Sequence, residues 1–368
     1  MILHIVEPTL NSYAGHCHSL VQAIVQAAPV EQVQIWAGKG GEKYWHGKGQ
    51  LKSHFFRPWR RIQAFFLYRR LLRQAGKVLL PTAGTSDLMT LDWVAKGLIP
   101  AHKIYLYIHW VGAKALKADK LAAIARHQPN LEILCTTPSG TAFFGALGFR
   151  ARTVSYPHSA SLLQDHQVSA FSHLVVAGAA RADKGFERIV DLVETLARSK
   201  AVWPILVQSS TTHHDKYSPE IRRLIDRLTG AGYAPLTLQI NTLTPANYLA
   251  QFHGGISIQP YSESDFEDRI SGVALDALCA ACPIVATANT WLARMVCRYR
   301  AGVVTSDLSP AGLIAAVERI LSDYNGYAQG AANAGHALNS QHSGSAMMAA
   351  IFEDSGLLDS EKMSQKLE

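Results

Sequence analysis

Two aspartates, Asp268 and Asp276, stand eight positions apart in the stretch DFEDRISGVALDALCAACPIVA. The small apolar residues between and after them predict a helix that begins near Ser271. The backbone N–H groups of Ser271, Gly272 and Val273, with the positive end of the helix dipole, would favour an anionic oxygen. Asp276 falls one turn into this helix, where its carboxylate can accept hydrogen bonds from paired sugar hydroxyls, and Asp268 falls in the loop before it. The stretch therefore combines a phosphate-binding helix N-terminus with acceptors for a sugar.

A second candidate for phosphate binding is the loop within VVAGAARADKGFERIV. A predicted strand ends at Gly178, the loop carries Arg181 and Lys184, and Gly185 opens an amphipathic helix. Lysine supplies a point charge and arginine a fork of donors, so two cations beside a helix N-terminus suit a diphosphate. The alternative is a solvated loop with ordinary surface charges.

Two single residues follow predicted strands in the first half of the chain. Gly15 precedes a helix, where a glycine lets backbone approach an anionic ligand, although no G-x-G-x-x-G pattern accompanies it. His109 ends the hydrophobic run IYLYI, a position from which an imidazole can bond to a substrate hydroxyl. A turn glycine and a structural histidine are the alternatives.

Cysteine usage argues against a disulfide framework. The cysteines are odd in number and scattered through a long chain, which favours reduced thiols and a cytoplasmic protein: Cys17, Cys135, Cys279, Cys282 and Cys297. Cys279 and Cys282 form a C-x-x-C, but no second ligand pair follows it. A buried structural pair is therefore favoured over a metal or redox site, and no metal is expected.

Basic residues gather in RPWRRIQAFFLYRRLLRQAGK, residues 57–77, in a chain whose net charge is +7. Aromatic residues interleave with its six arginines and one lysine. Three interpretations compete: an anionic membrane surface, a nucleic acid, or an ordinary helix with solvated arginines. For the last, Ile62, Phe65, Phe66 and Leu72 recur at helical spacing and can face a core. No nucleic-acid motif is recognisable, so no nucleic-acid partner is expected.

The 368 residues exceed what one hydrophobic core usually supports, and 48% of them are hydrophobic, so two domains are expected. No run of 18 apolar residues occurs. The start, MILHIVEPTL, lacks a basic n-region and a cleavage site, and is expected to form a buried first strand of a cytoplasmic protein.

Short apolar runs alternate with amphipathic patterns along the chain, which predicts α/β architecture with parallel sheets. Strands are predicted at 2–6, 33–37, 77–80, 104–108, 132–136, 153–156, 173–177, 204–208, 236–240, 255–259, 284–286 and 302–304. Helices are predicted at 15–28, 61–74, 87–96, 119–127, 138–147, 185–199, 218–229, 245–252, 272–281, 290–299 and 310–322.

The alternation pauses once, near the middle of the chain. We therefore expect an N-terminal Rossmann-like domain at 1–160, a linker at 161–171, a C-terminal Rossmann-like domain at 172–340, and a tail at 341–368 whose last part is frayed. Ligands of open parallel sheets bind at the carboxyl ends of the strands. A cleft between the two domains is the expected site.

Two motifs together resemble a known family. GAARADKG is similar to the G-R-L-x-x-x-K-G phosphate loop, and DRISGVALDALCAACPIVA to the E-x7-E stretch, of GT-B glycosyltransferases of family 4. The resemblance spans the chain, and its C-terminal half is the specific part. It implies a GT-B fold: two Rossmann-like, doubly wound domains facing across a cleft, with an acceptor held mainly by the first and a nucleotide-sugar donor by the second.

The resemblance also implies residue roles. Lys184 and the amides near Ser271 and Gly272 would contact the donor diphosphate, Asp276 the ribose, Asp268 the transferred sugar, and His109 the reacting centre. Gly15, Arg181 and Val273 complete the expected diphosphate site. Family members generally retain anomeric configuration and need no metal or cofactor, because the nucleotide sugar is a co-substrate.

Several positions depart from the family pattern. Ala179 stands where an arginine is expected, so Arg181 is its candidate replacement. Aspartates replace both glutamates, and each is one methylene shorter. The stretch PYSESDFED is longer than its counterpart, so Glu263 and Glu267 are alternative contacts for the donor sugar.

The leading hypothesis is a retaining glycosyltransferase that acts on a glycan or lipid-linked acceptor in cell-envelope polysaccharide or glycolipid synthesis. It would be cytoplasmic, with residues 57–77 near the inner face of the plasma membrane. The alternatives are another GT-B enzyme, such as an inverting transferase or a nucleotide-sugar epimerase, and a non-catalytic protein that binds nucleotide sugar.

Overall fold

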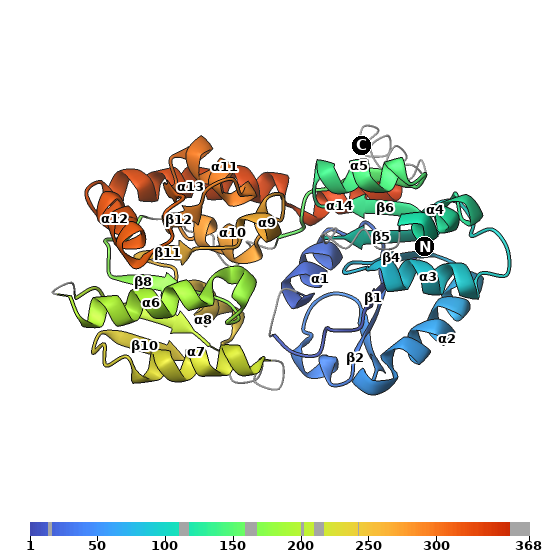
Figure 1. The fold of residues 1–368 in the computed structure, drawn as a ribbon. Coiled ribbons are helices and arrows are strands. Elements are labelled where there is room, and N and C mark those ends of the chain that lie inside the picture. The colour runs from blue at the N-terminus through green and yellow to red at the C-terminus, as the bar shows by residue number, and fades with distance from the viewer. Residues whose placement is uncertain are drawn as a thin grey trace, which may run out of the picture. The chain divides into compact units, whose positions relative to one another are not determined.

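A computed structural model describes residues 1–13, 17–109, 118–158, 168–199, 202–209, 217–241 and 243–353. The chain divides into two compact units (Figure 1). Unit 1 comprises Met1–Ser159 and Gln341–Glu368, and unit 2 comprises Ala160–Ser340.

Unit 1 is built on a seven-stranded sheet in the order β3-β2-β1-β4-β5-β6-β7, in which every neighbouring pair is parallel. The order reverses direction at β1, as in doubly wound folds. The strands are β1 (Ile2–Glu7), β2 (Gln32–Gly38), β3 (Gln50–Phe55), β4 (Lys77–Leu80), β5 (Ile104–Ile108), β6 (Glu132–Cys135) and β7 (Arg150–Thr153).

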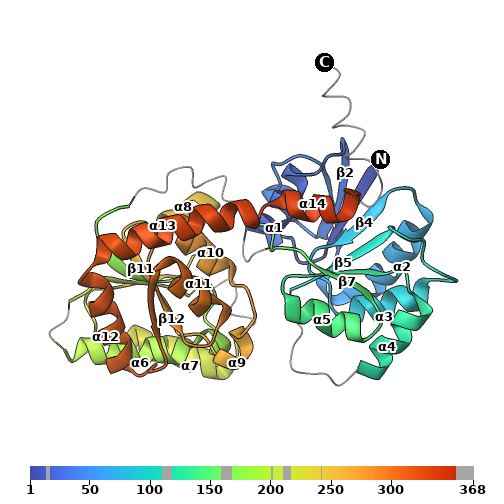
Figure 2. The same ribbon diagram turned by 90° about the horizontal axis from the view of Figure 1, so that it is seen from above.

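Helices cover both faces of this sheet, as the nearly continuous apolar strands require. One face packs against α2 (Arg60–Arg73), α3 (Thr85–Val94), α4 (Ala118–His127) and α5 (Pro138–Ala146) in a single apolar core. Figure 2 shows α1 (Cys17–Gln26) and α14 (Gly344–Phe352) on the other face. Two short 3-10 helices, η1 (Gly41–Tyr44) and η2 (Arg57–Trp59), precede β3 and α2.

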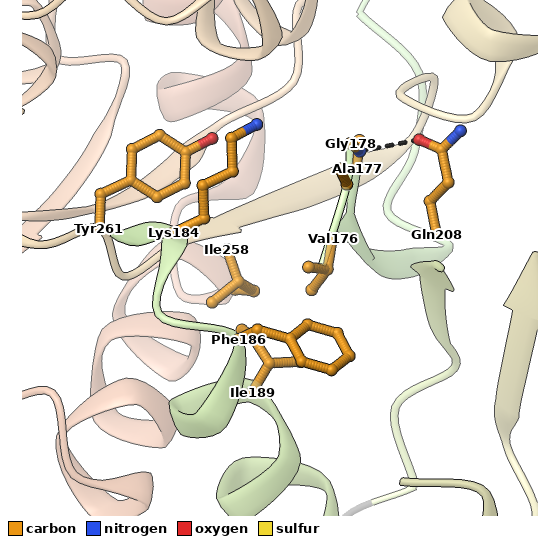
Figure 3. A pocket seen from close by; sticks show the side chains of 10 residues that line it. Val176, Ala177, Gly178, Lys184, Phe186, Ile189, Gln208, Ile258 and Tyr261 are labelled. Atoms are coloured by element: carbon orange, nitrogen blue, oxygen red, sulfur yellow. Dashed lines mark hydrogen bonds between the residues drawn. The ribbon is translucent and has the colours of Figure 1, made fainter. Parts of the chain in front are cut away.

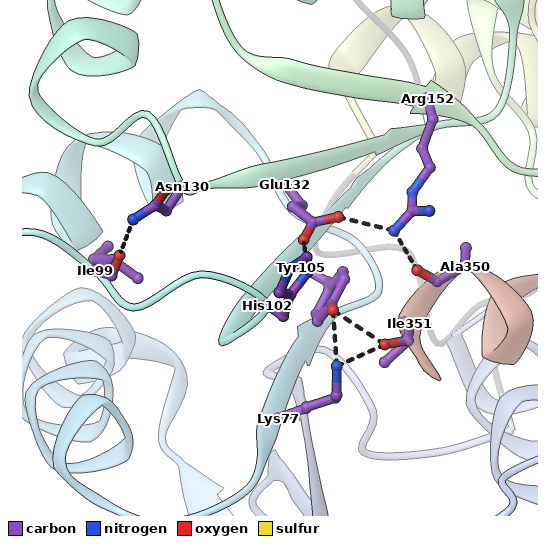
Figure 4. Close-up of polar contacts among 9 residues, drawn as sticks. All are labelled: Lys77, Ile99, His102, Tyr105, Asn130, Glu132, Arg152, Ala350 and Ile351. Atoms are coloured by element: carbon purple, nitrogen blue, oxygen red, sulfur yellow. Dashed lines mark hydrogen bonds and ion pairs between the residues drawn. The ribbon is translucent and has the colours of Figure 1, made fainter. Parts of the chain in front are cut away.

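Helix α14 returns the chain to unit 1, where polar side chains bind its last carbonyl groups (Figure 4). Lys77 Nζ donates to the Ile351 carbonyl at 2.7 Å, and the Tyr105 hydroxyl donates to it at 3.0 Å. Arg152 donates to the Ala350 carbonyl and, at 2.8 Å, to Glu132. The cations thus satisfy carbonyls that a helix C-terminus leaves without partners and complement its dipole.

Unit 2 is built on a six-stranded parallel sheet in the order β10-β9-β8-β11-β12-β13. The strands are β8 (His173–Val176), β9 (Ile205–Gln208), β10 (Leu236–Gln239), β11 (Gly255–Gln259), β12 (Ile284–Thr287) and β13 (Gly302–Thr305). The order reverses between β8 and β11, which places a topological switch point at their carboxyl ends.

One face of the second sheet forms a core with α6 (Phe186–Ala197), α7 (Pro219–Gly230) and α12 (Pro310–Leu321). Figure 2 shows α8 (Pro245–Ala250), α10 (Gly272–Cys279) and α13 (Tyr324–Gln341) on the other face. The remaining helices are η3 (Ala182–Lys184), α9 (Glu263–Phe266) and α11 (Trp291–Tyr299).

The predicted α/β class with parallel sheets is confirmed, but individual elements differ. Strand β3 was not predicted, and neither were α9, α13 and α14. The strand predicted at 153–156 lies at Arg150–Thr153. Its polar, partly exposed residues give no apolar signal, and the buried Val154 comes directly after it.

Three further expectations concern single features. Cys279 and Cys282 are both buried, as expected of a structural pair, and burial raises the pKa of the Cys282 thiol. Of the four residues that could face a core, Phe65 and Leu72 pack against it, whereas Ile62 and Phe66 are exposed. Among the described helices, none combines the length and apolar character that spanning a membrane requires.

Candidate functional site

The loop after β8 is held in place by two glycines with left-handed backbone. Gly178 has a φ of 93°, and its N–H donates to Gln208 Oε1 at 2.7 Å, which ties the loop to the end of β9. Gly185 has a φ of 68° and packs directly against the Pro260 carbonyl at the end of β11. The sequence thus folds residues 178–185 tightly over the carboxyl ends of β8 and β11.

Because Gly185 has no room for a side chain, we expect Gly185→Ala to destabilise unit 2. A Cβ there would lie 2.1 Å from the Pro260 oxygen, at a positive φ. The cost should be about 2 to 4 kcal/mol in the free energy of unfolding, measured by urea denaturation of the full chain. Gly230→Ala is the matched control, since a Cβ there meets nothing within 4 Å, and it should change stability by less than about 1 kcal/mol. Equal effects of the two substitutions would refute this account of the loop.

Lys184 lies where this loop meets the start of α10. Its Nζ would be 2.9 Å from a Cβ added at Gly178, and Val273 Cγ2 would be 3.3 Å from the same point. The ammonium also lies 5.6 Å from the centre of the Tyr261 ring. Figure 3 shows Lys184 and Tyr261 side by side at a small pocket whose lining includes Gly178 and Gln208.

The surroundings of Lys184 disfavour the charged form of its side chain when no ligand is bound. Burial lowers its pKa to about 8, and the charge of Arg181 contributes in the same direction. Arg269 also lowers the pKa of Lys184, whereas Asp183 and Asp276 raise it. A positive group held among cations in a partly dry site is a characteristic of anion-binding sites.

Arg181 and Arg269 share one carboxylate, that of Asp183. Arg181 Nε donates to Asp183 Oδ1 at 2.8 Å, and Arg269 Nη1 donates to Oδ2 at 3.2 Å. The Arg269 guanidinium also stacks 4.8 Å from the Phe266 ring centre, and burial lowers its pKa. With Lys184, these residues place one ammonium and two guanidinium groups around Asp183, and such donors suit a phosphate group.

The N-terminus of α10 forms the other wall. Ser271 is the N-cap, and its Oγ accepts a hydrogen bond from the Ala274 N–H at 3.4 Å. The Tyr261 hydroxyl lies 3.4 Å from the same Oγ, so one tyrosine contacts both the helix cap and Lys184. A Cβ at Gly272 would meet nothing within 4 Å, so the space beside this first turn is open. The first N–H groups of a helix lack partners within the helix and can serve an anion there.

Asp276 lies one turn further along α10 and hydrogen-bonds to Tyr248 from α8. Burial, and next the charge of Asp276, raise the pKa of the Tyr248 phenol well above its usual range. Tyr248 therefore remains a neutral donor that can orient the carboxylate.

The other predicted acids lie before α10, each with a distinct environment. Asp268 pairs with Arg294 at 3.1 Å, and Glu263 accepts a hydrogen bond from Asn289 at 2.9 Å. Glu267 is exposed at the end of α9. The residues around α9 thus offer three carboxylates.

His109 follows β5 in unit 1, as predicted. Its Nε2 lies 2.7 Å from the Pro81 carbonyl, which selects the tautomer that donates from Nε2. The ring packs edge-on against Tyr107 and Tyr156 at 4.9 and 5.3 Å. Gly15, the other predicted site residue of unit 1, lies outside the described residues.

The structure gathers most of the predicted residues of unit 2 and adds others. Arg181, Lys184, Val273 and Asp276 lie around one loop and one helix start. The sequence interpretation missed Gln208, Tyr248, Tyr261 and Arg269. Of these, Arg269 carried a signal, because it stands directly between Asp268 and the predicted helix start. In the described ranges, no group of histidine, cysteine, aspartate or glutamate side chains is arranged to hold a metal ion.

Comparisons with known proteins rest on structure. No protein-family model matches the chain, and no curated protein sequence matches it. Sucrose-phosphate synthase from Thermosynechococcus elongatus is similar, with a TM-score of 0.68, 13% identity, and coverage of 99% of this chain and 100% of that one. HepE from Anabaena in complex with UDP-glucose has a TM-score of 0.68 and 12% identity, with 96% and 99% of the two chains covered.

WaaG, a glycosyltransferase involved in lipopolysaccharide biosynthesis, has a TM-score of 0.62 and 13% identity, with 96% of this chain and 100% of that one covered. These similarities extend over nearly the full length of each chain and confirm the expected GT-B architecture. At such identities they show the fold and leave the reaction to be argued from the site. The chain therefore has the GT-B glycosyltransferase fold and resembles family 4 glycosyltransferases in structure, at low sequence identity.

Proposed function

We propose that this protein is a glycosyltransferase that moves a sugar from a nucleoside-diphosphate sugar to a glycan or lipid-linked acceptor. One observation carries the proposal: the Lys184 ammonium and the first turn of α10, at Val273, both lie against Gly178. A loop cation and a helix N-terminus thus converge beside a strand end, which suits a diphosphate. The HepE structures that contain UDP and UDP-glucose support a donor of this class.

The proposed chemistry begins with the leaving group. Departure of a nucleoside diphosphate develops negative charge on its phosphates. Lys184, Arg181 and Arg269, with the amides of residues 271–273, would stabilise that charge by fixed electrostatics. The Gly15 backbone, as the resemblance implies, would add to this site.

The sugar end of the donor would use the acids. Asp276, oriented by Tyr248, would accept hydrogen bonds from the ribose hydroxyls. Asp268 would contact the transferred sugar and favour an oxocarbenium-like transition state, with Glu263 and Glu267 as the alternative contacts. We propose retention of anomeric configuration on the strength of the family resemblance.

The acceptor side of the proposal depends on unit 1. His109 would bond to a hydroxyl near the reacting centre, with its tautomer set by Pro81. Cell-envelope polysaccharide or glycolipid synthesis is the proposed context, in the cytoplasm at the inner face of the plasma membrane. The scattered reduced cysteines are consistent with that compartment.

Arg269 supplies a test of how the missing arginine at Ala179 is replaced. We expect Arg269→Ala to weaken the binding of a nucleoside diphosphate about tenfold, because a charge-assisted hydrogen bond is lost. Arg181→Ala should have a similar effect, and calorimetric titration would measure both. Arg223→Ala, an exposed charge change on α7, is the control and should leave affinity unchanged. If the Arg269 and control variants bind alike, Arg269 is no part of the site.

The proposed function itself is tested by a ligand screen. Nucleoside diphosphates and nucleotide sugars with different bases should include at least one that raises the melting temperature of the full chain, because a ligand that binds only the folded state stabilises it. UDP and UDP-glucose are the first to try. If no nucleotide stabilises the protein, the donor site is wrong.

A further inference from the structure

Unit 1 exposes a group of large apolar side chains on neighbouring helices. We define the aromatic patch as five exposed residues: Phe56 (47% exposed), Trp59 (58%), Ile62 (51%), Phe66 (62%) and Trp93 (78%). Contiguous exposed patches of this kind in a folded protein usually mark interaction surfaces.

The patch is continuous across α2 and α3. Trp59, Ile62 and Phe66 recur at helical spacing along one face. The Phe65 ring lies 5.3 Å from that of Phe66 and 4.8 Å from that of Trp93 on α3, so it joins the two helices. Figure 2 shows α2 and α3 as neighbours in unit 1.

A different face of α2 supplies its contribution to the core. Ala64, Leu67, Tyr68 and Leu71 are buried and pack against the sheet and α3. The aromatic patch is therefore additional apolar surface that folding of unit 1 leaves in water, and its burial against a partner would be favourable.

Arginines flank the patch, and the nearby carboxylates of α3 interact with other side chains of unit 1. Residues 57–76 contain six arginines and no acid, and none of the six forms an ion pair with another described residue. Of the acids on α3, Asp87 accepts a hydrogen bond from Tyr68 at 2.7 Å, and Asp92 lies 3.5 Å from His127. This surface thus keeps a strong positive charge beside its aromatics.

We infer that the aromatic patch and its arginines dock unit 1 on an anionic lipid surface. Tryptophan side chains favour the membrane–water interface, and each arginine near anionic lipid adds binding energy. A second copy of the chain fits less well, because a symmetric contact would bring arginines against arginines. A nucleic acid would account for the charge but not for an apolar patch of this extent.

This inference rests on the proposed function only in that a lipid-linked acceptor would be presented at such a surface. The docking surface lies on α2 and α3 in unit 1, and the donor site lies in unit 2. The two can therefore fail separately in one set of experiments.

The test measures binding of the full chain to vesicles by flotation. Wild type should bind vesicles of phosphatidylcholine with phosphatidylglycerol, and should bind phosphatidylcholine alone much more weakly. Replacing Arg60, Arg61 and Arg73 by glutamine should lower affinity for the anionic vesicles about 100-fold. The matched control replaces three exposed arginines of unit 2, Arg223, Arg298 and Arg319, by glutamine. It should leave the affinity for anionic vesicles unchanged.

Replacing Trp59, Phe66 and Trp93 by serine should also lower vesicle affinity, at least about tenfold, and the loss should persist at high salt. Val202→Ser with Ile240→Ser, exposed in unit 2, is the apolar control. The far-ultraviolet circular dichroism spectrum and the thermal unfolding curve of both variants should match those of wild type, which would show that unit 1 still folds, and nucleotide binding, a property of unit 2, should be unchanged.

Three results would overturn the inference. The first is that wild type does not bind vesicles, or that neither the three arginine substitutions nor the three aromatic substitutions in unit 1 weaken its binding. The second is an arginine set that loses affinity for an oligonucleotide but not for vesicles. The third is a wild-type dimer that the aromatic set converts to a monomer. Vesicle binding without any nucleotide binding would instead support the docking surface and refute the proposed function.

Discussion

Replacing Lys184 by alanine is expected to abolish the binding of nucleoside diphosphates. The substitution removes the cation that lies against Gly178 and the first turn of α10, and leaves a diphosphate there without its closest partner charge. Loss of one member of a desolvated charge pair should lower affinity at least about 100-fold in calorimetric titration. Arg223→Ala, a distant loss of one charge in the same unit, should leave affinity unchanged.

The pH dependence supplies an independent readout of the same residue. Burial holds the pKa of free Lys184 at about 8, and a bound phosphate would raise it. Below that pH the lysine already carries its proton, so affinity should be nearly constant. Above it, unliganded Lys184 has lost its proton, and binding must restore it. The affinity should therefore fall by up to about tenfold for each pH unit. Lys184→Arg should remove this fall, because a guanidinium stays charged. A wild-type affinity that does not change between about pH 7 and pH 10 would contradict the assignment.

Replacing Asp276 by asparagine should remove discrimination between ribose and deoxyribose. A carboxylate that accepts from the ribose hydroxyls makes charge-assisted hydrogen bonds, so its loss should weaken nucleoside diphosphate binding about 10- to 100-fold. Wild type should bind the 2′-deoxy ligand more weakly than the ribose ligand. Asp276→Asn should bind both nearly alike, as titration of each pair would show.

Tyr248→Phe gives the matched variant for this prediction. It keeps the Asp276 carboxylate but removes the hydroxyl that orients it. We therefore expect a smaller loss of nucleoside diphosphate affinity than in Asp276→Asn, with part of the preference for ribose over deoxyribose retained. If Asp276→Asn lowers both affinities equally and keeps the wild-type preference for ribose, Asp276 acts on structure and not on the ribose.

The sequence predicted elements best where an apolar signal was strong and local. Strands such as Ile104–Ile108 are fully buried and read as short apolar runs between turns. Strand β3 was missed because its residues QLKSHF are polar and mostly partly exposed at the sheet edge. Helix α13 was missed because its YNGYAQGAANAGHALNSQ composition of alanine, glycine and polar residues is weakly amphipathic, although it buries nine residues.

The site was predictable to the extent that its residues lie in continuous motifs. Lys184, Gly185 and the start of α10 could be found because glycine and capping residues mark helix starts directly in sequence. Tyr248 and Gln208 come from elements far along the chain, and only the parallel sheet brings them to Asp276 and Gly178. The pairing of Arg269 with Asp183, 86 positions away, likewise depends on tertiary structure.

The most direct measurement of the central claim is release of nucleoside diphosphate from a nucleotide sugar by the purified full chain. With the donor identified by the ligand screen, wild type should release the diphosphate, slowly to water and faster when a suitable acceptor is added. Lys184→Ala should release none above background, whereas Arg223→Ala should match wild type. Tight donor binding without release under any condition would contradict transferase activity and indicate a non-catalytic binding protein. Equal release by wild type and Lys184→Ala would contradict the site.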